Sequence, residues 1–212
     1  MFGRRNFFTT GLASLFLAAL LLAGTPSKSQ AGEFGEDARI FIERLTQEAI
    51  STLTGKELSK AERAMRFRTL MNENFAIKGI AKFVLGRHWR KASESEQKEY
   101  LKLFEDLLVA TYADRFAKYS GEKLLVEKAD VRNQKDAIVH STMISVDSSK
   151  PLKVAWRVRA KKGSLKIIDI MVEGVSMAVT QRSEFNAVVR RQGIQGLLHA
   201  LRARTEKFGV AS

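Results

Sequence analysis

The spacing at which apolar residues recur changes twice along this chain. Up to Tyr119 apolar residues follow the 3.6-residue repeat of amphipathic helices, most clearly from Ser93 onward. From Leu124 to Val172 the repeat is two, which is typical of strands with one buried face. The helical repeat returns after Ser176. We therefore predict one α+β domain, in which a four-stranded antiparallel sheet is covered by amphipathic helices.

Several short signals mark where helices begin and end. Two serines each stand three residues before a glutamate, at the spacing of a capping box: Ser59 with Glu62 and Ser93 with Glu96. An apolar stripe over 37–53 predicts a first helix, and a short helix over 77–85 is expected to stop at Gly86. Gly193 is expected to hinge two C-terminal helices.

The last predicted strand, 165–172, is apolar on both faces, so we expect it to be central in the sheet. Strict alternation places Asp169 on the same face as Ile167 and Met171, where an unpaired carboxylate would be costly. One interpretation is a general base with a raised pKa in an apolar cavity. We favour a structural carboxylate that accepts backbone N–H groups and fixes the following turn, formed by Glu173, Gly174, Val175 and Ser176.

The first thirty residues have the features of an export signal. Arg4 and Arg5 precede an apolar stretch, 11–24, that is shorter than the roughly 20 residues needed to span a bilayer. Small residues stand at the −3 and −1 positions of a cut after Ala31. We predict that 1–31 is a cleaved signal peptide of Sec or twin-arginine type, which leaves 32–212 as one periplasmic domain. An uncleaved membrane anchor is the alternative.

Composition excludes several classes of site. The chain has no cysteine, which excludes disulfides, thiolate metal sites and cysteine nucleophiles. None of its three histidines pairs with another at i,i+4, and we expect neither a metal nor a cofactor. The formal charge of +13 predicts an acidic neighbour. Nucleic acid is not expected, because Trp156 alternates with the strand's bases and points away from them.

Two segments resemble a known family. The first is Val84-Leu85-Gly86-Arg87-His88-Trp89-Arg90-Lys91-Ala92-Ser93, followed by Glu96-Gln97 and Tyr100. The second, Asp169-Ile170-Met171-Val172-Glu173-Gly174-Val175-Ser176, is followed by Thr180-Gln181-Arg182. In this order they resemble the MlaC family, also called toluene-tolerance or ABC-transporter auxiliary proteins, over about 41–201. One subgroup of this family occurs in hopanoid-synthesis clusters. The resemblance implies an NTF2-like fold with a lipid cavity between the sheet and the helices.

The resemblance further implies a function as a periplasmic phospholipid carrier rather than an enzyme. Such a carrier works between an inner-membrane ABC transporter complex with an MCE domain and an outer-membrane lipoprotein–porin complex, and it contacts membrane surfaces transiently. The candidate lipid-binding residues are apolar and are expected to line the cavity: Phe83, Phe104, Leu108, Tyr112, Val139, Trp156, Ile168, Ile170 and Val172. The alternatives are a cavity enzyme with Asp169 as its base and a periplasmic adaptor without a ligand.

Overall fold

The computed structural model describes residues 28–146 and 150–207. The predicted signal segment lies outside the described residues, except for its last four. The elements, with η for 3₁₀ helices, are α1 (Lys28–Leu53), α2 (Lys60–Asn74), α3 (Ile77–Leu85), η1 (Gly86–His88), α4 (Glu94–Tyr112), η2 (Ala113–Lys118), β1 (Lys123–Val131), β2 (Asp136–Ile144), β3 (Leu152–Lys161), β4 (Ser164–Val172), β5 (Val175–Ser176) and α5 (Met177–Lys207). This order of helices, strands and a final helix confirms the predicted α+β class.

The strands form one antiparallel sheet in the order β1-β2-β3-β4-β5. Its four long strands are those predicted, and the fifth strand has only two residues, Val175 and Ser176. The expectation that 165–172 would be central is wrong, because β4 is followed in the sheet only by this two-residue edge strand. A strand can be apolar on both faces without being central when a helix covers its far side, and the start of α5 lies against β4.

The two faces of the sheet differ in polarity. On β3, the buried Val154 and Val158 alternate with the exposed Lys153, Arg157 and Arg159, which confirms the predicted half-buried strand. We call the face that carries Val154 and Val158 the inner face. Across the outer face, the guanidinium of the β3 arginine at 159 meets a carboxylate of the neighbouring strand β2. The outer face therefore pairs its charges across neighbouring strands, and the carboxylate, that of Asp136, is only 4% exposed.

A β-bulge at Ile168 changes which side chains of β4 face inward. Val158 pairs with Ile167, whereas the preceding residue of β3, Arg157, pairs with Asp169, so Ile168 is an extra residue. Strict alternation therefore fails across the bulge, and the predicted grouping of Asp169 with Ile167 is wrong. Asp169 lies on the outer face, while Ile167 stays on the inner face.

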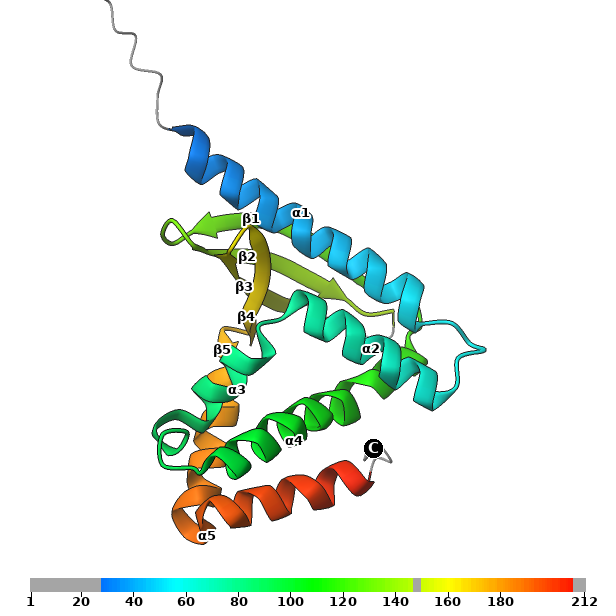
Figure 1. The fold of residues 1–212 in the computed structure, drawn as a ribbon. Coiled ribbons are helices and arrows are strands. Elements are labelled where there is room, and N and C mark those ends of the chain that lie inside the picture. Colours follow the sequence, from blue (N-terminus) through cyan, green and yellow to red (C-terminus); the bar gives the residue numbers. More distant parts are fainter. Residues whose placement is uncertain (1–27, 147–149, 208–212) are drawn as a thin grey trace, which may run out of the picture.

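Buried apolar residues form two clusters. The sheet cluster joins α1 and one residue of α2 to the inner face of the sheet, and it consists of Ala38, Phe41, Ile42, Leu45, Leu53, Leu70, Ala137, Val139, Val158 and Ile167. The helical cluster joins α2, α3, α4, η2 and α5, and it consists of Met71, Ile77, Ala81, Val84, Leu85, Tyr100, Leu103, Phe104, Leu107, Val109, Ala113, Ala178, Phe185, Leu197, Leu198 and Leu201. Figure 1 shows the same division: α1 lies along the sheet, and α4 runs beside the second half of α5.

The helix boundaries follow the predicted signals. Both capping boxes are present, because Ser59 and Ser93 each exchange hydrogen bonds with the glutamate three residues on. Helix α3 ends at Gly86, which has φ 59°. Within α5, Gly193 has φ 70° and ψ −178°, a conformation that essentially only glycine adopts. The C-terminal part is therefore two helices joined at Gly193, as predicted.

Candidate functional site

The boundary between the two clusters is the candidate site, and we call it the seam. Among the described residues, two partly buried side chains, Phe67 and Phe75, pack against both the sheet cluster and the helical cluster. Helix α2 ends at this boundary, and its adjacent residues Leu70 and Met71 belong to different clusters. A chain with two apolar clusters that meet along a narrow boundary can open there at a lower cost than through either close-packed cluster.

The predicted lining residues fall into three groups. Phe104 and Val139 are fully buried, one in each cluster. The residues that are half-buried and apolar are Leu108 on α4, Trp156 on β3, and Ile168, Ile170 and Val172 on β4. Of these, Leu108 packs against the helical cluster, whereas Trp156 and Ile170 pack against the sheet cluster. The half-buried group therefore adds partly exposed apolar surface to both clusters.

The remaining two predicted residues, Phe83 and Tyr112, lie at the surface. Phe83 is 44% exposed, and the guanidinium of Arg182 lies 4.9 Å from the centre of its ring. Tyr112 is 38% exposed, and Arg115 lies 5.1 Å from its ring. Each ring thus has a cation on one face and solvent beside it, which is a different environment from that of the seam.

Sequence reasoning did not identify Phe75, which the fold brings to the seam. It is the C-cap residue of α2, where the backbone becomes extended. There it forms an isolated parallel bridge with Ile167, and the following N–H, of Ala76, donates to the Ile167 carbonyl at 2.9 Å. Only this long-range pairing places the Phe75 ring between the clusters. Phe67, in contrast, lies within the helix whose start the capping box of Ser59 and Glu62 predicted.

A short hydrogen-bond chain fixes the Trp156 side chain. Its indole N–H donates to Ser141 Oγ at 3.0 Å, and that hydroxyl donates to the Val154 carbonyl at 2.8 Å. Ser141 is 3% exposed, so the chain satisfies polar groups that would otherwise be costly in an apolar face. The indole ring is thereby held in one orientation on the inner face of the sheet.

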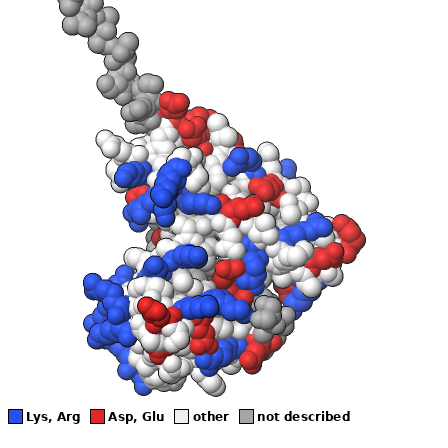
Figure 2. All heavy atoms as spheres, viewed as in Figure 1, with Lys and Arg blue, Asp and Glu red and all other residues white. Residues whose placement is uncertain are grey.

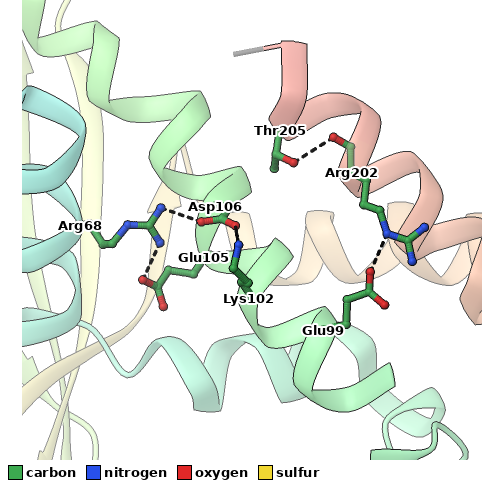
Figure 3. A network of polar contacts seen from close by, with 7 residues as sticks. All are labelled: Arg68, Glu99, Lys102, Glu105, Asp106, Arg202 and Thr205. Atoms are coloured by element: carbon green, nitrogen blue, oxygen red, sulfur yellow. Dashed lines mark hydrogen bonds and ion pairs between the residues drawn. The ribbon is translucent and has the colours of Figure 1, made fainter. Parts of the chain in front are cut away.

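Figure 3 shows an ion-pair network that ties α2 to α4. Arg68 donates from Nη1 to Glu105 Oε1 at 2.8 Å and from Nη2 to Asp106 Oδ1 at 2.6 Å. Asp106 is 2% exposed and also receives a hydrogen bond from Lys102. Partial burial lowers the pKa of Arg68, but the two carboxylates outweigh it and raise the pKa overall. The arginine therefore stays charged and joins the helix next to the sheet cluster to the central helix of the helical cluster.

A surface hollow of about 330 Å³ lies beside this network. Charged or polar residues and two apolar residues line it: Arg68, Asn72, Ile77, Lys78, Leu101, Lys102, Glu105 and Asp106. The hollow is therefore a surface groove between α2, α3 and α4, whereas the apolar cavity was predicted between the sheet and the helices. At the predicted position, the apolar side chains of the two clusters meet.

The carboxylate of Asp169 anchors the start of α5. It accepts a hydrogen bond from Ser176 Oγ at 2.6 Å and one from the Ala178 N–H at 3.1 Å. Glu173, with φ 49°, and Gly174, with φ 80°, form the two-residue loop between β4 and β5. The Glu173 carboxylate accepts from the Lys153 N–H at 2.7 Å. These contacts hold the turn and point away from the seam, so Asp169 is not placed to act on a molecule held there.

Two further observations concern the described residues alone. Within 28–146 and 150–207, no group of three or more His, Asp or Glu side chains is arranged to hold a metal ion. None of the helices in these ranges has the length and apolar character needed to cross a membrane.

Comparison with known proteins decides the family. The model of the MlaC protein family matches residues 43–203. This chain belongs to the MlaC family. A curated family member, the intermembrane phospholipid transport system binding protein MlaC of Haemophilus influenzae, is 25% identical over 118 residues, which are 54% of this chain and 55% of that protein. The chain thus matches about half the length of this curated family member.

A solved structure agrees with the MlaC assignment. The phospholipid-binding protein of Ralstonia solanacearum, solved in complex with a phospholipid, superposes with a TM-score of 0.72 and 20% identity. The match covers 81% of this chain and 98% of that one. At this level of identity the likeness establishes a common fold, which is the MlaC-like fold that the sequence resemblance implied.

Proposed function

We propose that this protein is a periplasmic phospholipid carrier that holds the acyl tails at the seam and leaves the headgroup in solvent. Membership of the MlaC family supports the class of function. The observation that carries the proposal is the pair of apolar clusters, with half-buried Trp156 and Ile170 packed against one cluster and half-buried Leu108 packed against the other. Residues 1–31 would be removed on export.

The physics of lipid transfer explains why such a boundary is useful. Two acyl chains with roughly 30 methylenes cost about 24 kcal/mol to place in water, at about 0.8 kcal/mol each. A carrier avoids this cost when the tails exchange one apolar environment for another. Phe104 and Val139 are covered by the protein's own atoms, so acyl tails reach these two side chains only if the two clusters move apart. When the lipid leaves, apolar contacts between the two clusters form again and replace the contacts that the protein made with the tails.

The partners follow from the family. We propose that the carrier receives and delivers lipid while docked on an inner-membrane ABC transporter complex with an MCE domain and on an outer-membrane lipoprotein–porin complex. Docking is required because release of the tails into water is too costly to be useful on its own. No bond is made or broken in this cycle, so the proposal assigns no catalytic residue.

Native mass spectrometry of the purified mature protein tests the proposal. We expect a co-purifying mass of lipid size, lost in Ile170→Arg and in Val172→Arg because a charge on the inner face excludes acyl chains. Leu125→Arg is the matched control: this β1 residue is 50% exposed on the outer face, and lipid should be retained. Circular dichroism verifies that each variant is folded.

Three results contradict the carrier. A clean ligand-free mass for the wild type would favour the adaptor. Equal lipid loss in the Leu125→Arg control would mean that lipid retention does not depend specifically on residues of the seam. A turnover abolished by Asp169→Asn with lipid retention intact would favour the enzyme.

A further inference from the structure

Lys and Arg side chains gather on the lower left of the molecule in Figure 2, where α3, η1 and the first half of α5 lie. The basic patch, as we define it, consists of exposed residues of these elements and of the turn after η1: Lys82, Arg87, Arg90, Lys91, Arg182 and Arg190. The chain from 74 to 93 contains five Lys or Arg after Glu73 and no Asp or Glu before Glu94. The patch therefore has a single sign of charge along the whole of one segment.

The cations of the basic patch have no carboxylate partner within the described residues. Ion pairs elsewhere involve Arg39, Lys60, Arg68, Lys102, Lys128, Arg157, Arg159 and Arg202, and none involves a residue of the patch. Six like charges without a carboxylate partner repel one another and destabilise the folded state slightly. An external anionic surface would relieve this repulsion.

The fold holds the two parts of the patch together. His88 in η1 shares a hydrogen bond of 2.9 Å with Asn186 on α5. Arg182, Asn186 and Arg190 are spaced by four residues, so they form one row along the helix beside η1. The patch is thus a preformed surface on ordered elements.

Aromatic rings are interleaved with these charges. The Lys82 ammonium lies 4.8 Å from the centre of the Trp89 ring, and Trp89 in turn packs against the helical cluster. Phe83 is 44% exposed beneath the Arg182 guanidinium. Aromatic side chains next to Lys and Arg are typical of surfaces that lie in the headgroup region of a bilayer.

We infer that the basic patch is the surface by which this protein adsorbs to an anionic phospholipid bilayer, with the bases on the headgroups and Phe83 entering the interface. A bilayer fits better than an acidic protein, because aromatic rings lie among the bases of the patch, as they do in the headgroup region of a bilayer. The patch contains no residue of the seam. Adsorption and lipid retention are therefore separate properties, which different variants can remove.

Co-sedimentation with vesicles tests this inference. The mature protein should bind vesicles of equal parts phosphatidylglycerol and phosphatidylcholine, bind pure phosphatidylcholine weakly, and lose binding as salt is added. Removing three bases in Arg87→Gln/Arg90→Gln/Lys91→Gln should lower the partition coefficient about 100-fold, at roughly fivefold for each base near the surface. Phe83→Ala should lower it about tenfold through lost apolar burial.

The matched control is Lys123→Gln/Lys135→Gln/Lys161→Gln, which removes the same charge from exposed sites at the ends of strands. Its partition coefficient should stay within about twofold of the wild type, because charges farther from the bilayer than the Debye length of ~10 Å are screened. Equal loss in both triple variants, or no binding to the anionic vesicles, would overturn the inference; the latter would favour an acidic protein partner. Ile170→Arg should still bind vesicles, so failure of the carrier proposal is distinguishable from failure of this one.

Discussion

Nη2 of Arg68 lies 2.6 Å from Oδ1 of Asp106, and this ion pair joins α2 to α4 across the two apolar clusters (Figure 3). The carboxylate is nearly inaccessible to solvent, at 2% exposed, whereas the arginine is partly open to it. A pair of this kind is costly to break by removing one partner, since the buried charge then keeps only its weaker contact with Lys102. Together with the hydrogen bond from Asn72 to Glu105, this ion pair must break if α2 and α4 are to separate.

Arg68→Met removes the ion pair with Asp106. We expect the free energy of unfolding to fall by about 2 kcal/mol, because Asp106 loses its shortest hydrogen bond. Lys60→Met is the control: its ion pair with Asp114 is 3.3 Å long and exposed, so the loss should stay below about 1 kcal/mol. Urea unfolding measures both. If the carrier proposal is correct, Arg68→Met also exchanges lipid with vesicles faster. An unchanged rate of exchange would mean that this ion pair does not limit the opening of the seam.

The ion pair of Asp136 on the outer face predicts that the stability of the protein depends on pH. Its carboxylate accepts from Arg159 Nε at 2.6 Å and from Nη2 at 2.7 Å, and this hydrogen bonding lowers the pKa of Asp136. A lowered pKa in the folded state contributes stability above the unfolded value of about 3.9 and loses it as the pH falls. We expect Asp136→Asn to cost about 2 kcal/mol at pH 7 and progressively less below about pH 4. Asp114→Asn serves as the exposed comparison, and a gap that persists in acid would contradict the assignment.

Substitution by alanine should have opposite effects on stability at Gly193 and at Gly79. Its φ of 70° and ψ of −178° are nearly closed to other residues, so Gly193→Ala should destabilise the protein by about 1–3 kcal/mol. Gly79 lies inside α3, where an added Cβ would meet its nearest atom at 3.9 Å. There Gly79→Ala should stabilise by about 0.5–1 kcal/mol through helix propensity. Thermal unfolding measures both effects. If both substitutions stabilised the protein, the fold would not require the break in α5 at Gly193.

Trp156 offers a fluorescence reporter of the seam, since the chain has only two tryptophans. In Trp89→Phe, lipid loading should shift the emission to shorter wavelength and protect the ring from acrylamide, because acyl chains replace water beside the half-buried indole. In Trp156→Phe, the remaining Trp89 packs in the helical cluster and should respond little. A response from Trp89 alone would place the lipid elsewhere.

Local sequence signals determined much of this protein. The change of repeat near Leu124 predicted the strands, and the two Ser–Glu pairs predicted the starts of α2 and α4, because capping and amphipathic burial depend on residues a few positions apart. The two family motifs alone also indicated the MlaC family, and the match to the family model confirmed it.

The tertiary structure decided the site. The bulge at Ile168 moved Asp169 to the outer face, and a strand's register depends on its partner as well as its own alternation. Phe75 reaches the seam through a bridge to Ile167, 92 residues further along the chain. Likewise, Arg68 finds Asp106 only because α2 and α4 pack together. Such contacts join residues far apart in sequence, so no local pattern encodes them.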